Sequence, residues 1–230
     1  MLQKESIIVI SLGGSILVPN KGIDTIFLKS FADLIKKEIK KNKRFIIVVG
    51  GGSIAREYQK SASELIELNN EDIDWLGIHA TRLNAQLLRT IFVKNAKHLV
   101  VKNPLRKIIW REKILIAAGW KPGWSTDYVA TRLAVKYKAR EVINLSNIEQ
   151  VYDRDPTRYE NAYPLDKISW SKFSKLVGTK WLPGMNAPFD PIATKYSKKH
   201  NLKVIVANGR NILNLQKILD QKKFFGTIIE

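Results

Sequence analysis

Three consecutive glycines at positions 50–52 are the residues that point most directly to chemistry. They follow the apolar run 45–49 and precede a helical pattern that carries Arg56 one turn in. Glycine lets ligand oxygens approach backbone N–H groups, and a helix N-terminus adds positive potential. The order of strand, glycine turn and helix is therefore typical of a phosphate-binding site. Glycine also serves tight strand-to-helix turns for conformational reasons, and this stretch alone does not separate the two interpretations.

Polar turns follow other apolar runs as well. The Gly13-Gly14-Ser15 turn, the segment 119–127 and the pair Ser146-Asn147 each come directly after such a run or close to its end. The carboxyl ends of parallel strands meet at one edge of a sheet, and ligands of open α/β proteins bind there. These turns together predict a long, polar cleft lined by backbone atoms.

The absence of several known motifs limits the kinds of reaction that this chain can catalyse. The chain has neither the P-loop pattern G-x-x-x-x-G-K-[ST] nor G-x-G-x-x-G. It has no cysteine, and its three histidines, at positions 79, 98 and 200, stand far apart beside helix-like sequence. We expect packing or surface roles for them rather than metal ligation. The pattern favours phosphoryl transfer, in which positioning and charge neutralisation replace a covalent nucleophile.

The elements that must position these turns alternate between strand and helix. Continuous apolar runs rich in Ile and Val predict parallel strands covered on both faces, at 7–10, 45–49, 99–101, 114–117, 141–145 and 204–206. Helical patterns lie at 23–41, 54–68, 75–94, 126–136, 170–177, 191–200 and 212–220. We expect an α/β fold, a three-layer sandwich with a largely parallel central sheet. The segment 224–229 is expected to add an edge strand, and prolines mark 153–191 as an irregular lobe.

Length and composition indicate one domain over residues 1–230. The chain is 45% hydrophobic and 26% charged, as in soluble globular proteins. No apolar run approaches the ~20 residues of a membrane span, and strand-like sequence begins too early to leave room for a signal peptide. We therefore expect no membrane segment and a cytoplasmic location, with which the absence of cysteine is compatible.

The charge is strongly basic, with 39 Lys and Arg against 21 Asp and Glu and a net charge of +18. Such a balance suits either nucleic acid or polyanionic metabolites. Most of the basic residues alternate with apolar ones at helical spacing, and no aromatic-rich sheet of an RNA-binding type accompanies them. We expect small anionic molecules as partners rather than nucleic acid.

Several segments together resemble the amino-acid-kinase fold family and, within it, the archaeal-type UMP kinases. The resemblance extends from 11–15 through 49–56 to 225–229, is most specific at Pro122-Gly123-Trp124-Ser125-Thr126-Asp127 and at 147–156, and includes 190–195. Single glycine strings would be weak signals. Their order and spacing along almost the whole chain identify the family.

The resemblance implies a mainly UMP-binding N-terminal half and a mainly ATP-binding C-terminal half. Gly51 would face the UMP phosphate and Asp74 the ribose, and Asp127 matches a carboxylate that organises the reacting groups. The loop that would wrap the nucleotide comprises Trp120, Lys121, Pro122, Gly123, Trp124, Ser125 and Thr126. From the residues alone, Asp74 can equally be a helix cap, and Asp127 can compensate a helix dipole.

For ATP, the resemblance implies contacts from Gly14, Ser15, Gly52, Arg56, Ser146, Asn147, Tyr152 and Asp155. Arg56 would bind phosphate as a fixed cation and is, with Asp127, a candidate catalytic residue. A surface arginine paired with Glu57 or Glu64 is the alternative. Magnesium would arrive with ATP, held largely by phosphates and water, so we expect no metal site built by the protein.

Three positions depart from the family pattern. Ser11 and Ser53 stand where relatives often carry lysine, and losing a positioned cation can cost orders of magnitude in rate. The charge could come from Arg56, Lys121, Lys180 or Lys195. Glu149-Gln150 replaces the usual Asp-Gly, so a turn that needs positive φ would be strained there, or the loop takes another path.

The resemblance implies ATP-dependent phosphorylation of UMP to UDP, by in-line transfer, in pyrimidine nucleotide biosynthesis. Relatives assemble as hexamers, so a homo-oligomer is expected on the same ground. Two alternatives stay open. One is a kinase for another small acceptor, and the other is a catalytically impaired, nucleotide-binding or regulatory member of the fold.

Overall fold

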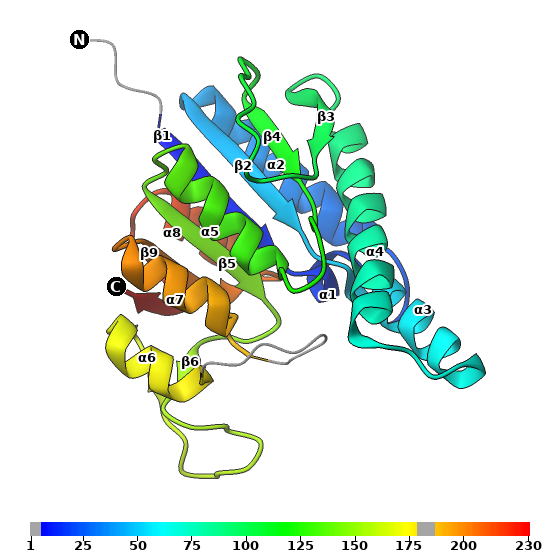
Figure 1. The fold of residues 1–230 in the computed structure, drawn as a ribbon. Helices are drawn as coiled ribbons and strands as arrows, with labels where there is room; N and C mark the ends of the chain where they lie inside the picture. Colours follow the sequence, from blue (N-terminus) through cyan, green and yellow to red (C-terminus); the bar gives the residue numbers. More distant parts are fainter. Residues whose placement is uncertain (1–5, 179–186) are drawn as a thin grey trace.

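The computed structural model describes residues 6–178 and 187–230, which form a large sheet between two layers of helices (Figure 1). The strand order within these residues is β3-β4-β2-β1-β5-β9-β10-β8. All neighbouring strands are parallel except β9 and β10. The bounds are β1 Ser6–Leu12, β2 Lys43–Val49, β3 Ala96–Val101, β4 Ile114–Ala117, β5 Glu141–Ser146, β8 Lys167–Ile168, β9 Lys203–Asn208 and β10 Thr227–Ile229.

Helices cover both faces of the sheet. Their bounds are α1 Gly14–Leu17, α2 Thr25–Lys40, α3 Gly52–Leu65, α4 Asn70–Ile91, α5 Thr126–Lys136, α6 Trp170–Val177, α7 Pro191–Lys199 and α8 Ile212–Leu219. A small antiparallel pair, β6 Val151–Tyr152 and β7 Pro164–Leu165, stands apart from the main sheet. Helices α5 and α7 lie in front of the sheet in Figure 1, whereas α2 and α8 lie behind it.

Alternation along the strands builds a hydrophobic core on each face. Ile8, Ile10 and Leu12 of β1 pack in one core with residues of α2, α4 and α8. Val9 of the same strand belongs to the other core, with residues of α5, α6 and α7. Successive side chains of a strand point to opposite faces, so near-continuous apolar runs are what a doubly covered parallel sheet needs. The three-layer α/β prediction is confirmed.

The predicted strands and helices all form, and most differences are at their ends. Helix α4 begins at Asn70, capped by the side chain of Asn69, rather than near position 75. The prediction of an edge strand at 224–229 was wrong in two respects. Only 227–229 is extended, and β10 is inserted between β9 and β8, so the two-residue β8 forms that edge. The pattern at 167–168 is too short to be recognised as a strand.

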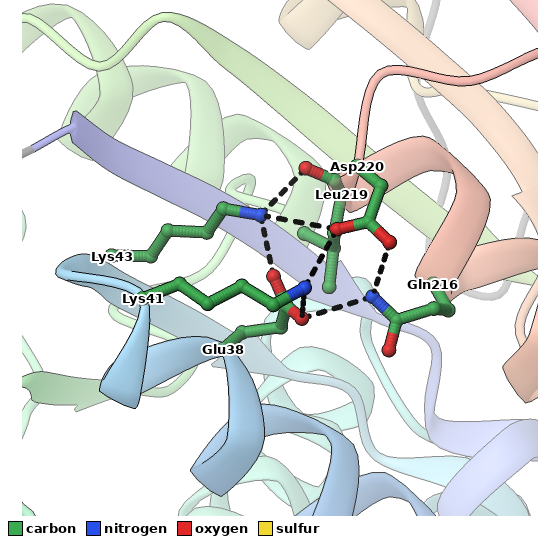
Figure 2. Close-up of polar contacts among 6 residues, drawn as sticks. All are labelled: Glu38, Lys41, Lys43, Gln216, Leu219 and Asp220. Atoms are coloured by element: carbon green, nitrogen blue, oxygen red, sulfur yellow. Dashed lines mark hydrogen bonds and ion pairs between the residues drawn. The ribbon is translucent and has the colours of Figure 1, made fainter.

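A polar network joins the end of α2, the start of β2 and the end of α8 (Figure 2). The fully buried Glu38 carboxylate pairs with Lys43 and, at 2.7 Å, with Lys41. Gln216 donates to Glu38 and to Asp220, each at 2.9 Å. Burial acts to raise the pKa of Glu38, but hydrogen bonds from Gln216, Lys41 and Lys43 outweigh it and hold the pKa below its ordinary value.

The network lies where β2 begins, at the sheet edge opposite the polar turns. It therefore stabilises the fold without contributing to the predicted cleft. No helix within the described ranges is long and apolar enough to cross a membrane.

Candidate active site

The two glycine turns contact each other through their backbones. They follow the adjacent parallel strands β1 and β2. A Cβ atom added to Gly14 would lie 2.0 Å from the nitrogen of Gly52, and one added to Gly50 would lie 2.4 Å from the nitrogen of Gly14. Gly52 also has a φ of +70°. Packing between the turns thus requires glycine here, in addition to any need for ligand approach.

The side chain of Asn84, on α4, fixes the glycine turn at 50–52. Its side chain is 2% exposed. Its amide nitrogen donates to the carbonyl oxygens of Gly50 and Gly51, both at 2.9 Å. The N–H groups of Gly51 and Gly52 have no acceptor within the described part of the chain and begin α3. The turn therefore offers free donors at a helix N-terminus, which suits an anion.

Helix α4 also fixes the predicted nucleotide loop. Thr81 Oγ1 accepts from the Gly119 N–H at 2.8 Å. Arg82 donates to the Trp120 carbonyl at 2.8 Å. Asp74 Oδ2 accepts from the Gly123 N–H at 2.7 Å, and burial raises the pKa of this carboxyl. Asp74 lies inside α4, so the helix-cap interpretation of Asp74 was wrong.

Asp190, which is buried, and Asp127, which is partly buried, form a carboxyl pair next to the start of α5. Ser11 Oγ donates to Asp127 Oδ1 at 2.8 Å, and Ser125 Oγ donates to Asp190. Burial and the charge of Asp190 raise the pKa of Asp127 from 3.8 to about 7, partly opposed by the Ser11 hydrogen bond. Ser125 also accepts from the Tyr128 N–H, so it is the N-cap of α5, as the sequence indicates.

Two pockets lie along the carboxyl edge of the sheet, and Arg56 lines both. Besides Arg56, the first, of 470 Å³, includes five residues predicted for UMP, two predicted for ATP and the catalytic candidate Asp127: Gly51, Asp74, Trp124, Ser125 and Thr126, then Gly14 and Gly52. The second, of 750 Å³, includes Ser15 and Asn147 from the predicted ATP set. The guanidinium of Arg56 donates to Asn20 at 3.2 Å. Glu64 pairs instead with Lys60, and within the described residues Arg56 pairs with neither Glu57 nor Glu64, so the surface-pair alternative was wrong.

Several predicted residues line neither of these pockets. Trp120, Lys121, Pro122 and Gly123 form the loop between β4 and α5, where the Trp120 and Trp124 rings lie 4.5 Å apart and Lys121 lies over both. Ser146 ends β5 and accepts from the Ile148 N–H at 3.3 Å. Tyr152 is in the β6–β7 pair, and Asp155 accepts from Thr157 and pairs with Arg158. The last two residues therefore have local roles in this conformation.

The departures from the family pattern have structural explanations. The Ser53 hydroxyl donates to the Pro19 carbonyl, in the loop before α2, at 2.9 Å. Neither Glu149 nor Gln150 has a positive φ, so the loop takes another path. Gln150, 2% exposed, donates to Asp166 and to the Gly226 carbonyl, and Glu149 accepts from Asn208.

Of the remaining candidate cations, Lys121 and Lys195 line neither pocket. Lys121 stacks on tryptophan, and Lys195 is exposed on α7. Lys180 lies outside the described residues.

Sequence reasoning missed Lys21 and Arg210, which line the larger pocket, and the supporting residues Asn84, Arg82 and Asp190. Only Asp190 carried a local signal, because Asp before Pro is a helix-start pattern. Among the described residues, no group of three or more His, Cys, Asp or Glu could hold a metal ion.

Comparison with known proteins gives a uniform result. A model described as the amino acid kinase family matches residues 6–208. A uridylate kinase of Methanococcus maripaludis is 35% identical over 205 residues, covering 88% of this chain and 90% of the relative. One of Thermococcus kodakarensis is 34% identical, covering 97% and 99%. The crystal structure of a uridylate kinase from Archaeoglobus fulgidus is similar with a TM-score of 0.81 and 32% identity, over 97% of this chain and 99% of that one.

Proposed function

This chain belongs to the amino acid kinase family, and we propose that within it the protein is a uridylate kinase that phosphorylates UMP with ATP. The γ-phosphoryl group passes to a phosphate oxygen of UMP, and UDP and ADP leave. The uridylate kinases that resemble it cover nearly its whole length. The observation that carries the proposal is the pair of pockets that share Arg56, the smaller of which is also lined by the triple-glycine turn.

The lining of the two pockets supports UMP binding in one and ATP binding in the other. UMP occupies the 470 Å³ pocket, between Asp74 and the start of α5. The triphosphate lies on the Ser15 and Asn147 side, in the 750 Å³ pocket. Transfer then takes place beside Arg56, which lines both pockets, with the free N–H groups of Gly51 and Gly52 on the UMP side. The UMP pocket is lined mainly by the first half of the chain, whereas the ATP pocket combines Ser15, residues 19–24 and Arg56 with Asn147 and Arg210 of the second half.

No general base is needed in this reaction, because the UMP phosphate is already an anion at neutral pH. The enzyme has to align two polyanions and neutralise the charge that accumulates between them. Arg56 and the backbone donors of the glycine turn do so without reorganising during transfer. Magnesium supplies further positive charge when it arrives bound to ATP, and the Asp127 carboxylate faces the same pocket.

The proposal extends to assembly and location. Leu65, Ile66 and Leu83, on or next to α3 and α4, are 83%, 63% and 62% exposed. Exposed apolar side chains of this kind support a homo-oligomer, which light scattering of the purified protein would detect. The substrates are metabolites of the cytoplasm, where we place the enzyme.

The direct test is a coupled assay with Mg-ATP and a panel of acceptors. We expect UDP from UMP, with much lower rates for CMP, AMP and GMP. A faster rate with another acceptor would identify a different kinase. ATP binding without transfer to any acceptor would identify a regulatory nucleotide-binding protein.

A further inference from the structure

The larger pocket contains more positive charge than the predicted ATP-binding residues provide. Lys21, Arg56 and Arg210 line its 750 Å³, and they come from three different parts of the chain. Asp24 is the only acidic side chain among the described residues that line it. A cavity in which three cations face one carboxylate attracts a polyanion.

We propose that Arg210 and Lys21 act with Arg56 as the cations that Ser11 and Ser53 do not supply, and that they bind the triphosphate chain that the proposed function assigns to this pocket. The inference deepens the proposed function and rests on it. It assigns roles to two residues that lie outside the segments carrying the family resemblance.

Arg210 is positioned to contact a phosphate at the first glycine turn. Its guanidinium pairs with Asp24 at 3.0 Å and donates to the Ser15 carbonyl at 3.3 Å, and the side chain is 46% exposed. The Asn208 side chain accepts from the Arg210 N–H at 2.8 Å and thereby shapes the turn. Because a guanidinium has five N–H donors, it can bind phosphate through one edge and keep its present contacts through another.

Lys21 reaches the pocket because two residues of α3 hold its loop. Ser53 donates through its hydroxyl to the Pro19 carbonyl and through its N–H to the Val18 carbonyl, both at 2.9 Å. Arg56 donates to Asn20. The Lys21 side chain has no hydrogen-bond or ion-pair partner in the described part of the chain. Serine at position 53 therefore fixes the segment that brings a replacement cation.

Asp24 allows a test in which binding should become stronger rather than weaker. Its Oδ1 accepts from the Phe27 N–H at 2.9 Å and caps α2, while its Oδ2 pairs with Arg210. The Phe27 hydrogen bond, followed by the interaction with Arg210, holds the pKa of Asp24 below its ordinary value, so Asp24 is charged at neutral pH. An Asp24→Asn variant keeps an oxygen for the cap and removes the charge that competes with phosphate.

The experiment measures equilibrium binding of Mg-ATP and of inorganic tripolyphosphate by calorimetry, together with initial rates. We expect R210Q to weaken both ligands about 10-fold or more, because it removes a charge-assisted hydrogen bond. It should raise KM for ATP and leave KM for UMP within about 2-fold. K21Q should weaken both ligands by a smaller factor, whereas D24N should strengthen them several-fold.

Arg140 supplies the matched control. It is exposed before β5, at the opposite edge of the sheet, and R140Q should bind both ligands as the wild type does. Unchanged ATP and tripolyphosphate binding in R210Q and K21Q overturns the proposal. Weaker binding in D24N also overturns it, because a purely structural ion pair predicts that result. Weaker tripolyphosphate binding in R210Q without a rise in KM for ATP would show that the pocket binds an anion other than the substrate triphosphate, and it overturns the proposal too.

These outcomes are separable from those that test the proposed function. If the wild type makes no UDP, the kinase assignment fails. Tripolyphosphate binding that R210Q weakens and D24N strengthens would still support the pocket.

Discussion

Ser11 Oγ lies 2.8 Å from Asp127 Oδ1 and donates a hydrogen bond to it, although the two residues are 116 positions apart in the chain. Ser11 is buried and Asp127 is partly buried, and the bond joins β1 to the start of α5. A lysine at position 11 would give this carboxyl a positive partner, whereas serine gives it a donor without charge. Burial and Asp190 consequently raise the pKa of Asp127 to about 7.

Asp127→Asn should stabilise the protein above neutral pH. A carboxyl whose pKa is higher in the folded than in the unfolded chain takes up a proton on folding, so the free energy of unfolding falls as pH rises from about 4 to about 7. Asparagine removes this loss, and we expect a gain on the order of 2 kcal/mol at about pH 8 and little gain at about pH 4. Urea unfolding at the two pH values measures it. Destabilisation at both would contradict the raised pKa.

The same Asp127→Asn variant should lose activity while it gains stability. The carboxylate faces the pocket in which transfer is proposed, and an amide attracts the cations of the reaction less strongly. We expect kcat to fall at least about 10-fold. A variant that is more stable and fully active would show that Asp127 has no role in transfer.

Asn84→Asp should weaken UMP binding through the glycine turn. The side chain of Asn84 donates to two buried carbonyls, and a carboxylate would present acceptors to both. We expect KM for UMP to rise about 10-fold and stability to fall by about 2 kcal/mol. Asn84→Ala should destabilise similarly. Gln86→Glu, at an exposed position of the same helix, is the control and should change neither quantity. Equal KM values in Asn84→Asp and the control would refute the positioning role.

Asp74→Asn should affect UMP binding and leave ATP binding unchanged, and so distinguish the two proposed pockets. The amide oxygen can still accept from the Gly123 N–H, so the loop should stay in place. The lost carboxylate charge should raise KM for UMP about 10-fold and leave KM for ATP within about 2-fold. Asp33→Asn, at an exposed position of α2, is the comparison variant. A rise in KM for ATP instead would reverse the assignment of the pockets.

Glu38→Gln should destabilise the fold without affecting substrate binding. It removes the fully buried carboxylate partner of Lys43, whose side chain is 15% exposed, and leaves the longer ion pair with Asp220 at 3.9 Å. We expect a loss of about 3 kcal/mol near neutral pH. Because the pKa of Glu38 is lowered in the folded protein, its stabilisation is present above the unfolded pKa of 4.5 and is lost as pH falls through the folded value.

The control for this change is Glu64→Gln. Glu64 is in an exposed pair with Lys60, with side chains 64% and 79% exposed, and the change should cost less than about 1 kcal/mol. Thermal unfolding at about pH 7 and about pH 3 provides the comparison. A Glu38→Gln defect that persists at the lower pH would exclude the charge network as its cause.

The fold could be predicted from the sequence because its strands have a strong local signal. Runs such as 45–49 are apolar on both faces, and such a strand requires a helical layer on each side. The β10–β8 edge could not be predicted, since β8 has only two residues and is defined by its partner. The start of α4 was also missed, because the polar stretch 69–74 has no apolar periodicity.

The site was predictable where residues lie next to a strand end, and less so where they reach it from elsewhere. Gly51 comes just after the end of β2, Asp127 lies in the first turn of α5, and both line the predicted cleft. Arg210 contacts the first glycine turn from 195 positions away, and no local pattern encodes that approach. The position of Lys21 depends on the hydrogen bond from Ser53 to the Pro19 carbonyl in the same loop. From the sequence, serine at position 53 indicated only that a lysine was missing, not that it fixes the loop of another lysine.

The initial rate of UDP formation from Mg-ATP and UMP by the purified wild-type protein tests the central claim most directly. That claim is that this site transfers phosphate without lysine at positions 11 and 53. We predict turnover above about 1 s⁻¹, within the range of kinases, and preference for UMP over other nucleoside monophosphates. Tight binding of ATP and UMP with no UDP formed would contradict the account.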